Sequence, residues 1–398
     1  CEDSADSLTS FATGNTGILA GDIGASTLKR DEYINWMRGQ DVDDVNGDGS
    51  TADTRAYVHA DVVHSRPLAW DFNSDPNDPD IVVFYGSNDG MLKAVNGNQT
   101  GTGAGDEYWA FLPPEAYDNI GTLRENTAEI RFPASGANAG EGISKPYGFD
   151  GQLALYQEDV DDDSLPDRWL FGGMRRGGRV VYALDVTNIG SPQLKWKVGC
   201  DDDDNCTTGG HFDDIGQTWS PISVTYSNGY DIETGTAKSP ILLMGGGYDE
   251  CEDDDNDGGD PDGGVAPVNN SCTDSSRGRG VYVLDANDGS LLKYLPTDRP
   301  VPGGVIVVYN DSRANPPDLS IKYAYTADTG GNVYRIHAET PSDDGLSMLP
   351  AMIGTAPPDE WVITKIAALG CDSLNTDASD LTCDANRKFL FNPDVVED

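Results

Sequence analysis

A recurring pattern of two short strands joined by a glycine-rich turn constrains the fold of this chain more than any single residue does. Each copy carries Tyr-, Val- or Leu-rich segments on either side of Gly, or of Asn-Asp-Gly, where a hairpin needs positive φ. The copies start roughly 75 to 85 residues apart, a spacing typical of repeat architectures. They cover residues 85–95, 171–173 with 178–185, 244–246 with 280–285, and 325–336.

The rest of the chain after residue 58 also alternates strands and turns. A further aromatic or apolar strand follows each of the first three copies, at 107–111, 194–196 and 291–294, which gives a unit of three to four antiparallel strands. Because no long amphipathic helix is present, alternating βα units are excluded. Many short strands at repeated intervals favour a sandwich, a β-helix or a propeller.

We predict an all-β fold and favour a β-propeller, because residues 281–292 resemble blades of the quinoprotein type. The repeat is longer than one minimal blade, so acidic loop insertions are expected between strands. The number of blades is left open: the ring has seven blades or is incomplete. We expect residues 1–57 to form an extended lead-in with one short helix at 31–38, capped by Asp31, and an acidic loop. Residues 58–398 form the propeller, and its truncation at the C-terminal end is left open.

The charge of the chain excludes one class of partner. With 26 basic and 68 acidic residues the formal charge is −42, so a phosphate backbone would be repelled and nucleic acid is not expected as a partner. No run of 18 apolar residues exists, so we expect no transmembrane helix. The start at Cys1 lacks the basic and apolar regions of a signal peptide, as in a mature or excised fragment.

The cysteines predict disulfide bonds. Six of the seven form sequence-adjacent pairs that bracket hydrophilic loops, and neither C-x-x-C spacing nor nearby histidine points to zinc. Loop-closing disulfides fit a secreted protein. The predicted pairs are Cys200 with Cys206, Cys251 with Cys272, and Cys371 with Cys383, while the partner of Cys1 is left open.

One acidic loop has the spacing of a calcium site. Residues 159–167 place oxygen donors at positions 1, 3, 5 and 9 and a main-chain carbonyl at position 7, like the first nine positions of an EF-hand loop. The EF-hand glutamate at position 12 is replaced by Leu170, so another carboxylate or water must complete the shell. The predicted Ca²⁺ ligands are Asp159, Asp161, Asp163, the carbonyl of Leu165, and Asp167.

Two other acidic runs are weaker candidates. Asp44, Asn46 and Asp48 occupy positions 1, 3 and 5 of a similar loop, with Asp53 just beyond the usual ninth position. Whether this loop binds a second Ca²⁺ or is only solvated is left open. The run at 252–262 has no apolar residue to anchor it, and we interpret it as a solvated loop.

Catalytic motifs are not found. The histidines, His59, His64, His211 and His337, show no zincin spacing, and no G-x-S-x-G motif surrounds a serine. We therefore predict that the protein is not an enzyme and that His64 has a structural role. The alternative is a quinone-dependent propeller oxidoreductase, which requires a complete ring and a metal carboxylate beside the cofactor.

Several segments of the first third resemble one known family in order and spacing. They are Tyr-Ile-Asn-Trp-Met-Arg-Gly at 33–39, Arg55, His-Ser-Arg-Pro at 64–67, Tyr-Gly-Ser-Asn-Asp-Gly-Met-Leu-Lys-Ala-Val at 85–95, and Tyr-Trp-Ala-Phe-Leu-Pro at 108–113. With the later copies at 178–187, 279–285 and 331–336, the similarity covers about residues 30 to 340. The chain resembles the C-terminal propeller of the PilC/PilY family, which is associated with the type IV pilus tip.

The resemblance implies an extracellular protein at the cell surface and pilus tip. It implies that the protein works together with minor pilins, supports pilus assembly against retraction, and adheres to host or abiotic surfaces. The family's large N-terminal part is absent, and members usually continue beyond the point where this chain stops. In the family, the calcium loop directly precedes a blade strand with the sequence Gly-Asn-x-Tyr/Trp-Arg. In this chain the predicted loop instead precedes the strand that begins near Arg168. The resemblance therefore implies a regulatory role of calcium only weakly. The adhesion ligand and the pilin contact face stay open.

Overall fold

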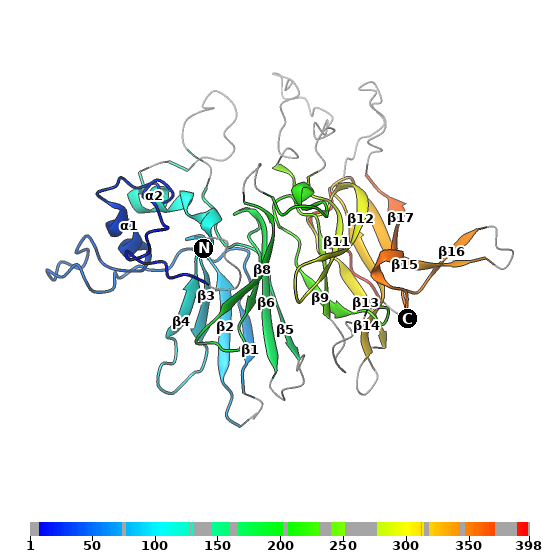
Figure 1. The fold of residues 1–398 in the computed structure, drawn as a ribbon, viewed down its shortest axis with the longest axis horizontal. Coiled ribbons are helices and arrows are strands. Elements are labelled where there is room, and N and C mark those ends of the chain that lie inside the picture. The colour runs from blue at the N-terminus through cyan, green and yellow to red at the C-terminus, as the bar shows by residue number, and fades with distance from the viewer. Residues whose placement is uncertain are drawn as a thin grey trace, which may run out of the picture. The chain divides into compact units, whose positions relative to one another are not determined.

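The computed structural model describes residues 8–73, 77–127, 129–130, 143, 145–158, 166–201, 206–230, 240–250, 277–311, 313, 318–342, 347–370 and 388–396. These residues are mostly β-strand, and the strands and helices are labelled in Figure 1. The chain divides into two compact units. Unit 1 comprises residues 1–153, 176–178 and 189–193, and unit 2 comprises the remainder.

Unit 1 holds the first sheet and the helices. Sheet 1 is a four-stranded antiparallel meander in the order β1-β2-β3-β4. Its elements are β1 (Leu68–Asp71), β2 (Ile81–Gly86), β3 (Leu92–Asn96) and β4 (Glu107–Phe111), with the helices α1 (Arg30–Met37) and α2 (Asp118–Glu125) and the 3-10 turn η1 (Pro114–Ala116).

Unit 2 contains almost all of the remaining strands. Sheet 2 has the order β5-β6-β7-β8, sheet 3 the order β9-β10-β11-β12, and sheet 4 the order β13-β14-β15-β17, with β16 paired to the far end of β15. A single parallel bridge from Tyr226 to Ser320 joins sheets 3 and 4. The strands are β5 (Leu153–Glu158), β6 (Asp167–Gly173), β7 (Arg179–Asp185), β8 (Gln193–Cys200), β9 (Ser223–Tyr226), β10 (Pro240–Gly245), β11 (Arg279–Asp285), β12 (Leu291–Pro300), β13 (Ile306–Asp311), β14 (Asp318–Ala327), β15 (Asn332–Pro341), β16 (Met348–Ala351) and β17 (Val362–Ala368).

The repeated hairpins of the sequence are the central strand pairs of these sheets. The four copies form β2–β3, β6–β7, β10–β11 and β14–β15, and all four pairs are antiparallel. Successive four-stranded antiparallel meanders are the unit from which β-propellers are built. The prediction of an all-β propeller fold is therefore confirmed, whereas the blade number, the closure of the ring and the boundary at residue 57 stay predictions.

The helices differ in part from the sequence prediction. Helix α1 begins at Arg30 and its N-cap is Lys29, so the assignment of the cap to Asp31 was wrong. Asp31 lies in the first turn, where its carboxylate is paired with Arg30 at 2.6 Å and where negative charge favours the helix dipole. Helix α2 was not predicted. It contains Gly121, which weakens a helical pattern.

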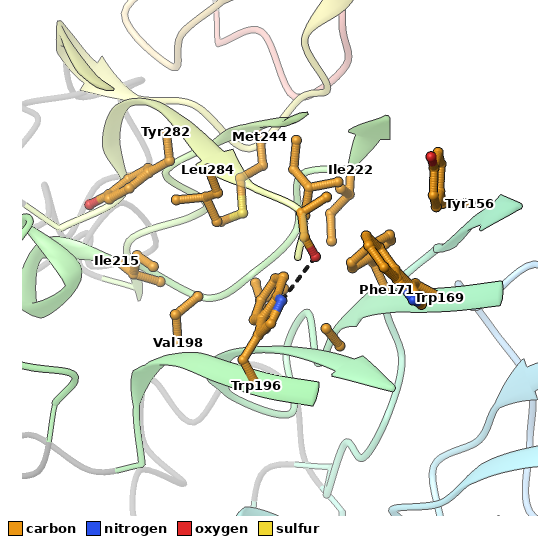
Figure 2. Close-up of a cluster of buried hydrophobic side chains, with 14 of the residues drawn as sticks. Tyr156, Trp169, Phe171, Trp196, Val198, Ile215, Ile222, Met244, Tyr282 and Leu284 are labelled. Atoms are coloured by element: carbon orange, nitrogen blue, oxygen red, sulfur yellow. Dashed lines mark hydrogen bonds between the residues drawn. The ribbon is translucent and has the colours of Figure 1, made fainter. Parts of the chain in front are cut away.

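An aromatic core of unit 2 lies between sheets 2 and 3 (Figure 2). Trp169, Phe171 and Trp196 come from sheet 2, and Met244 and Tyr282 come from sheet 3. The indole N–H of Trp196 donates a hydrogen bond of 3.0 Å to the main chain of Ala286, so its one polar atom is paired inside the core. Each such side chain stabilises the fold by about 1.5–3 kcal/mol through its burial.

Glycine ends the second strand of each of the first three sheets, and another part of the main chain passes over it. The glycines are Gly86 of β2, Gly173 of β6 and Gly245 of β10. The residues that pass over them are Phe149, Thr218 and Val301, respectively. Each of these lies in the segment that leads to the first strand of the following sheet, so the glycines permit the crossing from one sheet to the next.

One predicted disulfide bond falls within the described residues and is confirmed. Cys200 at the end of β8 is bonded to Cys206, and the two residues also form an antiparallel bridge. The Cys200 sulfur lies 3.4 Å from the carbonyl oxygen of Phe212, so the disulfide lies against the start of the 3-10 turn η2 (Phe212–Asp214). The pairs Cys251 with Cys272 and Cys371 with Cys383 lie outside the described residues.

Peptide mapping under nonreducing conditions tests the other two pairs. We expect one linked peptide that joins Cys251 to Cys272 and one that joins Cys371 to Cys383, because each pair closes a short polar excursion between apolar segments. The bond between Cys200 and Cys206 serves as the internal control for sample oxidation. Free thiols at these four positions, with the control bond intact, would show the assignment to be wrong.

Candidate functional site

The predicted calcium loop is the connection between two neighbouring strands of sheet 2. Strand β5 ends at Glu158 and strand β6 begins at Asp167, and the two strands are adjacent in the sheet. Of the predicted ligands, Asp167 is described, and it is half-buried. Asp159, Asp161, Asp163 and Leu165 lie outside the described residues, so their role as ligands stays a prediction.

The surroundings of Asp167 are rich in negative charge. Burial raises the pKa of the Tyr156 hydroxyl on β5, and the neighbouring Tyr226, Glu158 and Asp167 raise it further. Glu158 is the last residue of β5 and Asp167 is the first residue of the adjacent strand β6. A cation at this end of the hairpin would therefore relieve repulsion between strand-end carboxylates, which fits a hard divalent ion with oxygen ligands.

Lys195 on β8 already supplies one positive charge to this region. Its ammonium lies 3.9 Å from the ring centroid of Trp169 and donates a hydrogen bond of 2.8 Å to the side-chain oxygen of Asn287. Burial lowers the pKa of Lys195, while the charges of Asp185 and Asp167 oppose that shift. Sequence reasoning missed this residue, because a lone lysine in a strand gives no signal of a partner 92 residues away.

The second candidate loop is described, and its polar groups bond to one another. The main-chain N–H of Gly49 donates to the Asp44 carboxylate at 3.1 Å, and the Asn46 amide donates to Asp53 at 2.9 Å and to Asp48 at 3.4 Å. Asp44 adopts a positive φ of 51°, so the loop is tightly wound. Among the residues that the structure describes, no group of three or more His, Cys, Asp or Glu side chains could hold a metal ion.

The histidines are engaged in local contacts. His64 donates its main-chain N–H to Asp150 Oδ1 at 3.1 Å, and its Nδ1 lies 2.5 Å from Oδ2 of the same buried carboxylate. This geometry agrees with the structural role predicted for His64. His59 bonds to Tyr85, His211 to Asp214, and His337 to Ala338 and Thr364.

Residues 64–67 and 85–95, two of the segments that carried the family resemblance, meet in unit 1 beside the turn of the first hairpin, where the N–H of Gly86 donates to Ser65 Oγ at 2.7 Å. The Asn88 amide donates to Asp61 at 2.9 Å, and Lys145 also bonds to Asp61. Burial acts to raise the pKa of Asp61, but these hydrogen bonds outweigh it and lower the pKa. Asp89 of the same turn pairs with buried Lys93 on β3 at 3.2 Å.

A second group of contacts lies around α1 and includes Trp36 and Arg55 from the segments that carried the family resemblance. The Arg55 guanidinium lies 4.0 Å from the ring centroid of Trp36, a cation–π contact. Arg124 on α2 reaches Glu32 and Asp43, each at 2.8 Å. Arg124 was missed together with α2. The two groups orient the segments at 33–39, 55 and 85–95, which is a positioning role rather than a catalytic one.

No helix in the described part of the chain is long and apolar enough to cross a membrane. The comparisons with known proteins point to one family. Residues 69–229 match the family described as the PilY1 β-propeller domain. A type IV pilus biogenesis factor PilY1 homolog of Xylella fastidiosa is 28% identical over 258 residues, which cover 60% of this chain and 16% of that protein.

A type IV pilus biogenesis factor PilY1 of Pseudomonas aeruginosa is 24% identical over 340 residues, which cover 79% of this chain and 23% of that protein. The chain thus spans less than a quarter of the length of these two relatives. The crystal structure of the Pseudomonas aeruginosa PilY1 C-terminal domain aligns with 72% of this chain and 44% of that chain, at a TM-score of 0.41 and 20% identity. This match agrees with the resemblance seen in the sequence: residues 69–229 of this chain are similar to the PilY1 β-propeller domain family.

Proposed function

We propose that this chain is the propeller part of a type IV pilus biogenesis factor, acting outside the cell as a binding protein rather than as an enzyme. The observation that carries the proposal is the match of residues 69–229 to the PilY1 β-propeller domain. The names of the relatives from Xylella and Pseudomonas, both type IV pilus biogenesis factors, support it. The histidine contacts described above are compatible with a binding role.

The proposal extends to location and partners. The protein works at the pilus tip with minor pilins, where it supports assembly against retraction, and it adheres to host or abiotic surfaces. The support for these statements is the similarity of residues 69–229 to the PilY1 β-propeller domain family. The bonded Cys200–Cys206 pair adds support for an oxidising, extracellular location.

Removal of the matched domain tests the proposed role. The full-length protein lacking residues 69–229, produced in its own host in place of the native protein, should reduce the number of surface pili counted by electron microscopy to the level of a gene deletion. Deletion of residues 252–262, an acidic run outside the matched range, should leave the count unchanged. If the variant lacking 69–229 is secreted at the normal level and the cells are fully piliated, the proposal fails.

We also propose that the loop between β5 and β6 binds Ca²⁺ through Asp159, Asp161, Asp163, the Leu165 carbonyl and Asp167. The calcium would neutralise the loop carboxylates and join the loop to the start of β6. The Glu158 and Asp167 carboxylates at the adjoining ends of β5 and β6 support this proposal, because together they favour a cation at the strand ends.

Calcium titration tests this site. Wild-type protein should gain about 2.7 kcal/mol of stability when free Ca²⁺ is a hundredfold above its dissociation constant, as for any ligand that binds only the folded state. The pair Asp161→Ala and Asp163→Ala removes two hard ligands and should abolish the gain in a thermal unfolding assay. The matched pair Asp253→Ala and Asp255→Ala removes the same charge from a loop interpreted as solvated and should retain the gain. Equal responses of the two variants would contradict the assignment.

A further inference from the structure

Strand β16 forms a two-stranded arm with the end of β15 that extends away from the rest of sheet 4 (Figure 1). In this arm Ala338 pairs with Ala351, and Pro341 pairs with Met348. An isolated two-stranded ribbon buries little apolar surface of its own. The arm nevertheless carries large apolar side chains that are about half exposed, with Met348 at 52% and Leu349 at 49%.

The base of the arm is fixed to the core. Ile353, just after β16, is 1% exposed, and its N–H donates to the carbonyl oxygen of Lys322 on β14 at 3.0 Å. Trp361 is fully buried, and its indole N–H donates to the carbonyl oxygen of Ala356 at 3.0 Å. The exposed apolar side chains therefore project from a well-packed base, and their exposure is a property of the arm rather than of a loose chain end.

The two faces of the arm differ in chemistry. Residues paired across antiparallel strands share a face, and neighbours along a strand alternate between faces. The register places Pro341, Met348, Glu339 and Pro350 on one face, which we call the Met348 face. The opposite face carries Thr340 and Leu349. The Met348 face thus has a continuous apolar surface bordered by one carboxylate, whereas the opposite face has a single large apolar side chain.

The prolines limit how a partner can bind. Pro341 and Pro350 lack the N–H group that a further strand would require, so strand addition along the arm is disfavoured. A partner must therefore be recognised through side chains. Methionine suits such a contact, because its flexible and polarisable side chain adapts to apolar surfaces of different shape.

The charge of the region selects the class of partner. Between residues 336 and 364 the chain has no lysine or arginine, and its charged residues are Glu339, Asp343, Asp344, Asp359 and Glu360. A second copy of a chain with a formal charge of −42 would be repelled, and so would an anionic lipid surface. Charge complementarity favours a protein that carries positive charge.

We propose that the Met348 face is a docking surface for a separate protein whose apolar groove is bordered by lysine or arginine. Met348, Pro341 and Pro350 fill the groove, and Glu339 faces the basic border. Because the contact is made by side chains on one face, residues on the Thr340 face take no part in it. The proposal stands on the exposure, register and charge of the arm and is independent of the role proposed for residues 69–229.

Photocrosslinking tests the proposal. A benzophenone amino acid is placed at Met348, or at Thr340 as the control on the opposite face, in the full-length protein within its native host, and crosslinked peptides are identified by mass spectrometry. We expect crosslinks from Met348 to one protein, at a surface with neighbouring lysine or arginine, and few from Thr340. Equal yields at both positions, or crosslinks only to lipid or to a second copy, would overturn the proposal.

Charge reversal supplies the second measurement. In the Met348 crosslinking strain, Glu339→Lys should lower the crosslink yield by about fivefold, because it places like charges together at the groove border. The matched reversal Glu360→Lys lies in the same acidic stretch but outside the arm, in the 3-10 turn η5 (Pro358–Glu360), and should leave the yield unchanged. Protein level and melting temperature serve as folding controls. An unchanged yield in Glu339→Lys would contradict the assigned partner chemistry.

Discussion

The close approach of main chain to glycine at the end of a second strand is the constraint on which the repeated sheets depend. At Gly86 a Cβ atom would lie far inside contact distance of the Phe149 carbonyl oxygen, and at Gly173 it would lie 2.8 Å from the Thr218 side chain. Neither neighbour can move far, because Phe149 is fully buried and Thr218 is 3% exposed. The segment that leads to the next sheet can therefore cross only where the side chain is absent.

Serine hydroxyls reinforce the same junctions. The N–H of Gly86 donates to Ser65 Oγ at 2.7 Å, and the N–H of Gly245 donates to Ser220 Oγ at 2.8 Å. Both serines precede the first strand of their own sheet. Each serine thus accepts a hydrogen bond from a buried main-chain N–H. Leaving that N–H unpaired would lower the stability of the fold. In sheet 4 the equivalent strand ends in Ala327 instead, so this glycine is found in three of the four described sheets.

The sequence allowed the hairpins to be predicted because their signals are local. In the hairpins β2–β3 and β14–β15, for example, the alternating apolar residues and the turn glycines lie within a few residues of one another. Other features depend on partners that are distant in the sequence. His64 meets Asp150 across 86 residues. Helix α2 approaches Gly24 closely at Gly121 and reaches Glu32 on α1 through Arg124, and neither partner is local in the sequence. The calcium loop was predicted from donor spacing, and the structure adds the place of Asp167 at the start of β6.

The absence of a side chain at Gly86 is essential to this fold. Equilibrium unfolding of the variants Gly86→Ala and Gly14→Ala tests this most directly. A Cβ atom added at Gly14 would have open space around it, and alanine there would stabilise the protein by making the unfolded chain less flexible. We predict that Gly86→Ala loses about 2 kcal/mol or more of unfolding free energy, as for overpacking in a tight core, whereas Gly14→Ala is unchanged or slightly more stable. Equal stability of the two variants would contradict the account.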